Sequence, residues 1–165
     1  MITEFFKGYG VEGEQNKIIR FSAKKCLVLY GYGTDELGIG YNYRKYYDHE
    51  PTTDEIRSDI EALINTETDE SILNGWTWEG VPIYLSLTNQ VNFASAYTVA
   101  EATDGGNLPL TMKVGEVDGE PQYVTFEDTA TLQSFYTSMV EYISGCLSAG
   151  WAEKDAVDYS AYVIK

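Results

Sequence analysis

The chain has 165 residues, of which 44% are hydrophobic and 22% charged, and its formal net charge is −15. This length and apolar content allow a buried core and argue against intrinsic disorder. No apolar run approaches the ~18–20 residues that cross a bilayer, and the N-terminus lacks a signal-peptide pattern, so we expect no membrane association. Cys26 and Cys146 share no motif, and we expect both to be free thiols.

The acidic residues are concentrated in the second part of the chain. Residues 1–50 contain seven basic and seven acidic residues, whereas residues 51–165 contain four basic and nineteen acidic ones. Such an acidic body repels phosphate backbones, so we expect no nucleic-acid partner. The acidity serves either solubility at high local concentration or an acidic face for a basic partner, and the sequence leaves both interpretations open.

Residues 1–48 form the first predicted region, which is rich in tyrosine and glycine. The segments 18–22, 26–30 and 39–47 have the composition of strands, and residues 31–35 are expected to interrupt the pattern. Short aromatic strands separated by glycines are typical of an antiparallel meander. A meander of this size is marginally stable alone, so it must pack on the following region or on a partner.

Half of the fourteen tyrosines lie in this first region. They are either half-buried strand residues with solvated hydroxyl groups, or a contact surface, since tyrosine gives a large contact area at a small entropic cost. On the second interpretation, residues 1–48 are an attachment region and the main intermolecular contact, and the chain from about Pro51 folds without them. The candidate partner-contact residues are Tyr9, Tyr30, Tyr32, Tyr41, Tyr43 and Tyr46.

The second predicted region, residues 52–165, begins with a helix. Thr52 and Glu55 have the spacing of a capping box. A helical stripe of Ile56, Ile60, Leu63 and Ile64 follows, and the polar residues 66–70 are expected to interrupt the helix before a further turn at 71–73. Next comes a hairpin from Trp76 to Leu85 with its turn at Glu79–Gly80.

Two further helices complete the predicted fold. The first runs from Leu87 to Thr103, with Ser86 as N-cap. It carries Leu87, Val91 and Ala94 on a common stripe, with Phe93, Tyr97 and Ala100 beside it. Strands are predicted at 108–114 and 122–126, and a long helix at 128–149 that ends at Gly150, with Trp151 folded back on it. This last helix is expected to bury Leu132, Phe135, Met139, Ile143 and Cys146. The predicted class is α+β: a small antiparallel sheet from both hairpins with three packed helices, preceded by an N-terminal β meander.

No pattern of catalytic residues is present. His49 is the single histidine and lies in the charged segment Asp48-His49-Glu50, which leaves no basis for a nucleophilic triad or a spaced metal motif. The glycine clusters at 31–33 and 38–40 are not followed by the lysine of a phosphate loop. We therefore predict no catalytic, cofactor-binding or metal-binding residues, and a protein that is not an enzyme.

Trp76 and Trp78 lie two residues apart and therefore on one face of the predicted hairpin. Such a pair is either part of the core or a platform on which a sugar ring stacks. The second possibility gives an alternative function, a small glycan-binding or host-surface-binding module that uses exposed aromatic side chains.

Residues 52–158 resemble a domain of uncharacterised function at the C-terminal end of bacteriophage tail-fibre-associated and virion proteins, from phages of gut bacteria. The resemblance rests on Trp78, Leu85, Asn89-Gln90, Leu108-Pro109 and Gly150-Trp151 with the following Lys154. It implies a virion protein, made in the host cytoplasm, that has a structural or assembly role. Its implied partners are other virion or fibre proteins, or further copies of itself, and the resemblance transfers no active-site residue.

Overall fold

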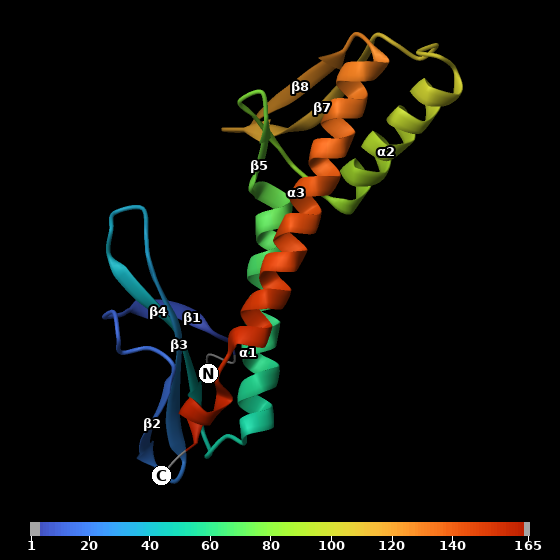
Figure 1. Cartoon of the computed structure of the whole chain (residues 1–165). Coiled ribbons are helices and arrows are strands. Elements are labelled where there is room, and N and C mark those ends of the chain that lie inside the picture. Colours follow the sequence, from blue (N-terminus) through green and yellow to red (C-terminus); the bar gives the residue numbers. More distant parts are fainter. Residues whose placement is uncertain (1–3, 164–165) are drawn as a thin grey trace. The chain divides into compact units, whose positions relative to one another are not determined.

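A computed structural model describes residues 4–163 and confirms the α+β class. Within these residues, a four-stranded meander precedes three α-helices and two further hairpins (Figure 1). The chain divides into two compact units: unit 1 comprises Met1–Asn65 and Glu153–Lys165, and unit 2 comprises Thr66–Ala152. These boundaries lie inside helices α1 (Thr53–Asn74) and α3 (Thr129–Ala156), whereas the sequence placed the division at residues 48–52.

The sheet of unit 1 is antiparallel, with the strand order β1-β4-β3-β2. The three predicted strands are β2 (Lys17–Ser22), β3 (Lys25–Thr34) and β4 (Gly40–Tyr47). The sequence analysis missed β1 (Phe6–Tyr9), which pairs with β4 along its full length. A four-residue strand that contains a glycine has too little pattern to be recognised alone.

The predicted interruption at residues 31–35 is wrong, because β3 continues to Thr34. The register between β3 and β4 shifts after Tyr30, and Gly31 adopts a left-handed conformation with φ +59°. Its N–H donates to Asn16 Oδ1 at 3.0 Å. The glycine therefore permits a bulge that bends the strand without ending it.

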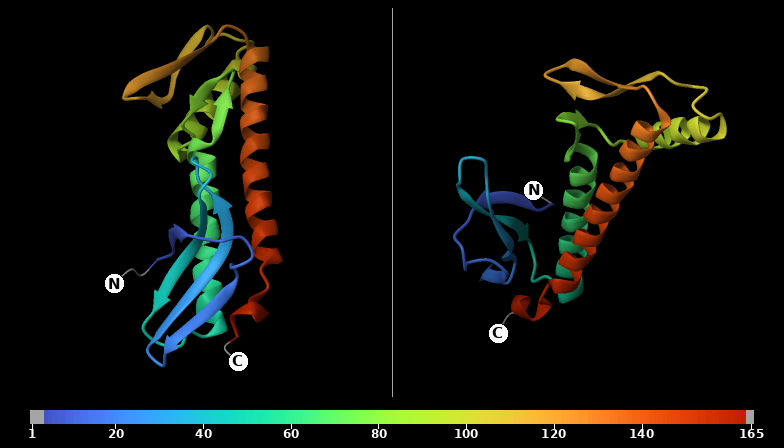
Figure 2. Two further views of the ribbon diagram at one scale, coloured as in Figure 1. Left: turned by 90° about the vertical axis from the view of Figure 1, so that its left-hand side faces the viewer. Right: turned by 45° about the horizontal axis from the view of Figure 1, so that its top comes forward.

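The core of unit 1 lies between the sheet and the first half of α1 (Figures 1 and 2). The helix contributes Ile56, Ile60 and Ile64, each at most 2% exposed, as its stripe predicts, whereas Leu63 of the same stripe is half-buried. A short 3-10 helix, η1 (Tyr159–Tyr162), adds Tyr162 from the end of the chain. The sheet supplies Cys26, Val28, Tyr30 and Tyr47.

Helix α1 begins at the predicted capping box. The N–H of Thr52 donates to Glu55 Oε2 at 2.7 Å, and the N–H of Glu55 donates to Thr52 Oγ1 at 3.2 Å. The predicted interruption at 66–70 is wrong, because α1 is continuous to Asn74. This polar segment contains neither glycine nor proline, so nothing in it breaks the backbone hydrogen bonds of the helix.

Unit 2 contains two hairpins. The first pairs β5 (Trp76–Trp78) with β6 (Val81–Ile83), and the second pairs β7 (Leu110–Val117) with β8 (Glu120–Phe126). They are separate two-stranded sheets connected by one backbone hydrogen bond, Tyr84 N to Val114 O at 2.7 Å, and not the single sheet predicted from both. Strand β6 ends four residues before α2 (Leu87–Ala102) begins, which leaves too little extended chain for a longer ladder.

The predicted local signals in unit 2 are confirmed. Both hairpin turns have positive φ angles at their central residues, 49° and 82° at Glu79–Gly80 and 52° and 82° at Asp118–Gly119. This is the backbone twist that two-residue hairpins prefer. Ser86 caps α2 by accepting from Asn89 N at 3.2 Å. The Asn89 side chain donates to the carbonyl oxygen of Tyr84 at 2.7 Å.

Phe135 of α3 is at the centre of the core of unit 2. Its ring centroid lies 5.0–5.4 Å from four other rings, those of Trp76, Trp78, Phe93 and Phe126. Leu132 and Met139 are buried beside it, as predicted. Ile143 and Cys146, also predicted to be buried, are only half-buried.

The buried face of α2 is formed by residues beside the predicted stripe of Leu87, Val91 and Ala94, and not by the stripe itself. Leu87 is 80% and Val91 is 63% exposed, and Ala94 is half-buried. The buried residues of α2 are Phe93 and Ala100. Phe93 contacts Phe135 and Tyr97 stacks on Tyr136 at 4.9 Å, and these aromatic contacts turn the predicted stripe outward.

Gly150 does not end α3, which continues to Ala156. It is buried, and a Cβ atom placed on it would overlap Thr68 Oγ1 of α1. The glycine therefore permits a close approach between the two helices. Trp151, predicted to fold back on the helix end, lies within the helix and is 60% exposed.

We expect Gly150→Ala to lower the free energy of unfolding by about 1–3 kcal/mol, the usual cost of overpacking a close contact. The matched control is Gly145→Ala in the same helix, where an added Cβ meets no atom within 4 Å. That substitution should raise stability by about 0.5–1 kcal/mol because alanine favours the helix. Urea unfolding measures both, and equal stability of the two variants would contradict the close α1–α3 contact.

Candidate functional site

The structure separates the six tyrosines predicted as partner contacts. Tyr30 is buried, and its hydroxyl donates to Glu153 Oε1 at 2.8 Å. Tyr30 is part of the core of unit 1, and burial, together with this hydrogen bond, raises its pKa. Tyr43 is half-buried against the core. Tyr46 is 38% exposed and stacks on Phe6 at 6.2 Å, away from the turn between β3 and β4. Tyr30 is therefore not available as a contact, and Tyr43 is only partly exposed.

The remaining three tyrosines, Tyr9, Tyr32 and Tyr41, lie near the end of the sheet where β3 turns into β4. Tyr9 is directly opposite Tyr41 in the β1–β4 ladder. Just beyond it, Gly10 N donates to Gly40 O at 2.9 Å, so the segment after β1 runs along the start of β4. The exposed large apolar residues of this region form what we call the tip surface: Tyr9, Val11, Tyr32, Leu37 and Ile39.

The turn that carries Leu37 is ordered by Asp35. Its carboxylate oxygen Oδ1 accepts from the N–H groups of Leu37 at 2.9 Å and Ile39 at 2.8 Å. The backbone closes the same turn through Gly38 N to Asp35 O at 2.9 Å and Asp35 N to Ile39 O at 3.0 Å. Leu37 is nevertheless 84% exposed. An ordered turn thus holds a large apolar side chain in solvent, where it buries little surface within its own chain.

Sequence reasoning centred on tyrosine and missed both Leu37 and the role of Asp35. The available signal was Asp35 followed by Gly38, since an aspartate side chain often accepts from backbone N–H groups two residues further on in a turn. Exposure itself could not be found this way, because Leu37 and Ile39 have the same apolar character as core residues.

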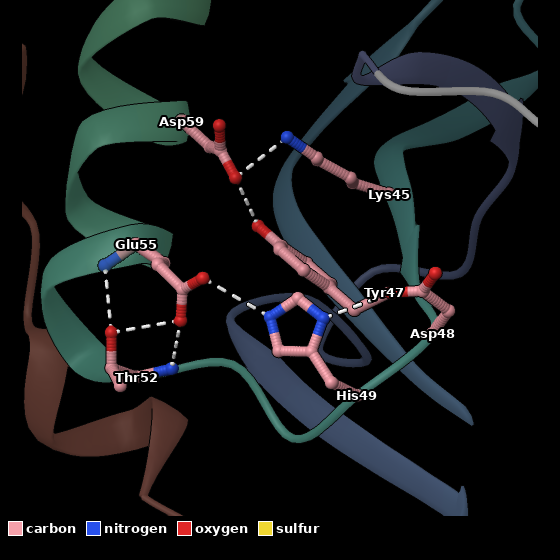
Figure 3. Close-up of polar contacts among 7 residues, drawn as sticks. All are labelled: Lys45, Tyr47, Asp48, His49, Thr52, Glu55 and Asp59. Atoms are coloured by element: carbon pink, nitrogen blue, oxygen red, sulfur yellow. Dashed lines mark hydrogen bonds and ion pairs between the residues drawn. The ribbon is translucent and has the colours of Figure 1, made fainter. Parts of the chain in front are cut away.

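A cluster of polar side chains connects the end of β4 to the start of α1, as Figure 3 shows. Asp59 of α1 lies 2.6 Å from Lys45 Nζ and accepts from the Tyr47 hydroxyl. His49 is exposed, as predicted, with Nδ1 3.0 Å from Asp48 and Nε2 3.1 Å from Glu55. In residues 4–163 no group of three or more His, Cys, Asp or Glu side chains is placed to hold a metal ion. The cluster joins the sheet to the helix.

Asp48 and Glu55 accept hydrogen bonds from the ring N–H groups of the protonated His49, and this raises the pKa of His49 above its ordinary value of 6.5. A raised pKa in the folded state adds stability below pH 6.5, which is lost as the pH rises through the folded-state pKa. We therefore expect the melting temperature to fall as the pH rises through that window, and His49→Gln to remove this part of the fall. NMR titration of the single histidine should show the raised pKa return toward 6.5 in Asp48→Asn; an unchanged pKa would contradict the contact.

Unit 2 contains an open groove of about 860 Å³ between α2 and the two hairpins. Its wall includes Tyr84, which is 44% exposed, and the side chains of Asn89 and Asn92. Lys113 and Glu116, which form an ion pair, lie on the β7 side. An exposed aromatic ring beside amides and a charged pair is a chemically mixed surface suited to a polar organic ligand.

Trp76 and Trp78, the predicted stacking residues, do not line this groove. Trp76 is 8% exposed, and its ring centroid is 6.2 Å from that of Trp78. Both rings pack against Phe135. Trp76 is part of the core of unit 2, and Trp78 is half-buried against that core. The exposed aromatic side chain that lines the groove is Tyr84, and no sequence pattern indicated it.

Comparison of the chain with protein-family models, with curated proteins and with solved structures finds no match. No helix in the described part of the chain is long and apolar enough to cross a membrane.

Proposed function

We propose that this chain is a non-enzymatic protein that acts by protein–protein contact through the tip surface. The observation that carries the proposal is Leu37, exposed on a turn that Asp35 holds in one conformation. Exposed apolar patches mark interaction sites, and a preorganised loop loses little conformational entropy on binding. The aromatic residues Tyr9 and Tyr32 beside it belong to a type that is enriched in protein interfaces.

The proposed setting is a phage virion, as a tail-associated or fibre-associated structural or assembly component. It is supported by the resemblance of residues 52–158 to virion proteins and by the residues that carry that resemblance, among them Trp78 and Gly150. The proposed partner is another virion or fibre protein with an apolar depression that accepts Leu37 and Ile39.

The test replaces Leu37 and Ile39 together by serine. Both side chains are at least 50% exposed, so the variant should keep its melting temperature and lose its association with fibre and virion proteins in pull-down experiments. The matched control is Phe21→Ser in β2, which is 57% exposed but lies outside the tip surface. Mass spectrometry of purified virions should find the wild-type chain and the control. Equal incorporation of the double variant would overturn the tip surface as the contact.

A second candidate function is glycan or host-surface binding, and the groove of unit 2 favours it. The Tyr84 ring can stack on a sugar, and Asn92 and the Lys113–Glu116 pair can bond its hydroxyl groups. On a glycan array, Tyr84→Ala should then lose any binding that the wild-type chain shows. Absence of wild-type binding, or equal binding by the variant, would reject this candidate.

A further inference from the structure

Exposed apolar side chains of unit 2 occur on two neighbouring helices, α2 and α3. On α2, Leu87 and Val91 are 80% and 63% exposed, although their spacing is that of a buried stripe. On α3, Val140, Leu147 and Trp151 are 42%, 36% and 60% exposed. We call these five residues the α2–α3 face. The spacing of Leu87 and Val91 is typical of a helix face that is covered, yet these side chains are exposed in the single chain.

The face has both a ridge and a groove. Val140, Leu147 and Trp151 are spaced i, i+7 and i+11, which places them along one side of α3 and forms the ridge. The groove, about 290 Å³ in volume, lies between the helices. Its walls are Leu87, Gln90, Val91 and Ala94 of α2 and Tyr136, Met139, Val140, Ile143 and Ser144 of α3.

Charge is nearly absent from these two helices within unit 2. In a chain with 26 acidic residues, Leu87–Ala102 contains only Glu101, and residues 129–152 contain only Glu141. Glu101 accepts a hydrogen bond from the Tyr97 hydroxyl near the C-terminal end of α2. Solubility alone would place charges on an exposed helix surface, so their absence from this one indicates that it is covered.

We propose that a second copy of this chain covers the α2–α3 face, in a two-fold symmetric contact. In such an isologous contact both copies use the same patch, so the patch must complement itself. The ridge beside the groove satisfies this condition, because the ridge of each copy can enter the groove of the other. Two chains of net charge −15 repel each other across most surfaces, whereas this uncharged face brings them together without pairing like charges.

The experiment measures the mass of the full chain in solution by sedimentation equilibrium. The wild type should form a dimer, and Val91→Glu combined with Val140→Glu should weaken the dimer at least about tenfold, since each copy would then bury two unpaired carboxylates. The matched control is Val117→Glu, which puts the same charge on a residue that is 38% exposed in β7. The double variant must keep the wild-type circular dichroism spectrum; if it does not, Leu87→Ser combined with Trp151→Ser takes its place.

Salt provides a second readout. Because the contact is apolar and the two copies repel each other, raising the ionic strength should tighten the dimer. A wild-type chain that stays monomeric at its highest soluble concentration in high salt overturns the proposal. The proposal is also overturned if the dimer persists in the α2–α3 face variants but dissociates in the Leu37→Ser/Ile39→Ser variant. The tip surface would then mediate self-association. Loss of virion binding without loss of the dimer in that variant supports two separate contacts.

Discussion

Phe135→Ala should lower the free energy of unfolding of unit 2 by about 3–5 kcal/mol, the range for a fully buried phenylalanine. Phe135 is 0% exposed and contacts the rings of Trp76, Trp78, Phe93 and Phe126, which come from β5, α2 and β8. Truncation leaves a cavity that all of these elements line. Since a whole domain is stable by about 5–15 kcal/mol, one substitution removes a large share of that stability.

Urea unfolding followed by tryptophan fluorescence measures this effect, because Trp76 and Trp78 report directly on the cluster. Tyr123→Ala is the matched control: it also truncates an aromatic residue of unit 2, but one that is 58% exposed, so stability should change by less than about 0.5 kcal/mol. A loss below about 1 kcal/mol for Phe135→Ala would mean that α3 presents another face to the core.

The sequence predicts the elements of this fold better than their ends. The capping box at Thr52, the N-cap at Ser86 and the turn at Glu79–Gly80 are local signals, and each is confirmed. The predicted interruption at 66–70 is wrong because that segment contains no residue that breaks a helix. The predicted end at Gly150 is wrong because tertiary packing decides it. Gly150 meets Thr68 of α1, a contact between residues 82 positions apart that no local pattern reveals.

The candidate site, too, could be predicted only in part from local sequence patterns. Sequence composition identifies residues 1–48 as rich in tyrosine, but it cannot separate buried Tyr30 from exposed Tyr9, because both lie in aromatic strands. Strand pairing and the bulge after Tyr30 decide which side chains face α1. Likewise, the spacing of Leu87 and Val91 predicts a covered stripe without saying whether the same chain covers it.

The first strands contribute more to the fold than the sequence suggests. The expectation that the chain from about Pro51 folds alone treats the meander as an attachment. In the structure, however, β3 and β4 cover Ile56, Ile60 and Ile64 of α1 and also Tyr162 near the end of the chain. Without the sheet, these four buried side chains would face solvent. Each fully buried isoleucine contributes about 1.5–3 kcal/mol, so three of them exceed what one helix gains from its own propensity.

Deletion of residues 1–50 should therefore unfold what remains of unit 1 and leave unit 2 folded. Hydrogen exchange followed by mass spectrometry resolves the two: residues 53–65 and 157–162 should lose protection, whereas β7, β8 and the Phe135 cluster should keep it. The milder control is Ile60→Ala in the full chain, which should lower stability by about 2–5 kcal/mol and keep the sheet. Full protection of residues 53–65 in the deleted chain would show that α1 is stable without the meander, as the sequence first suggested. Loss of protection throughout would show instead that both units unfold as one, because α1 and α3 each contribute residues to both.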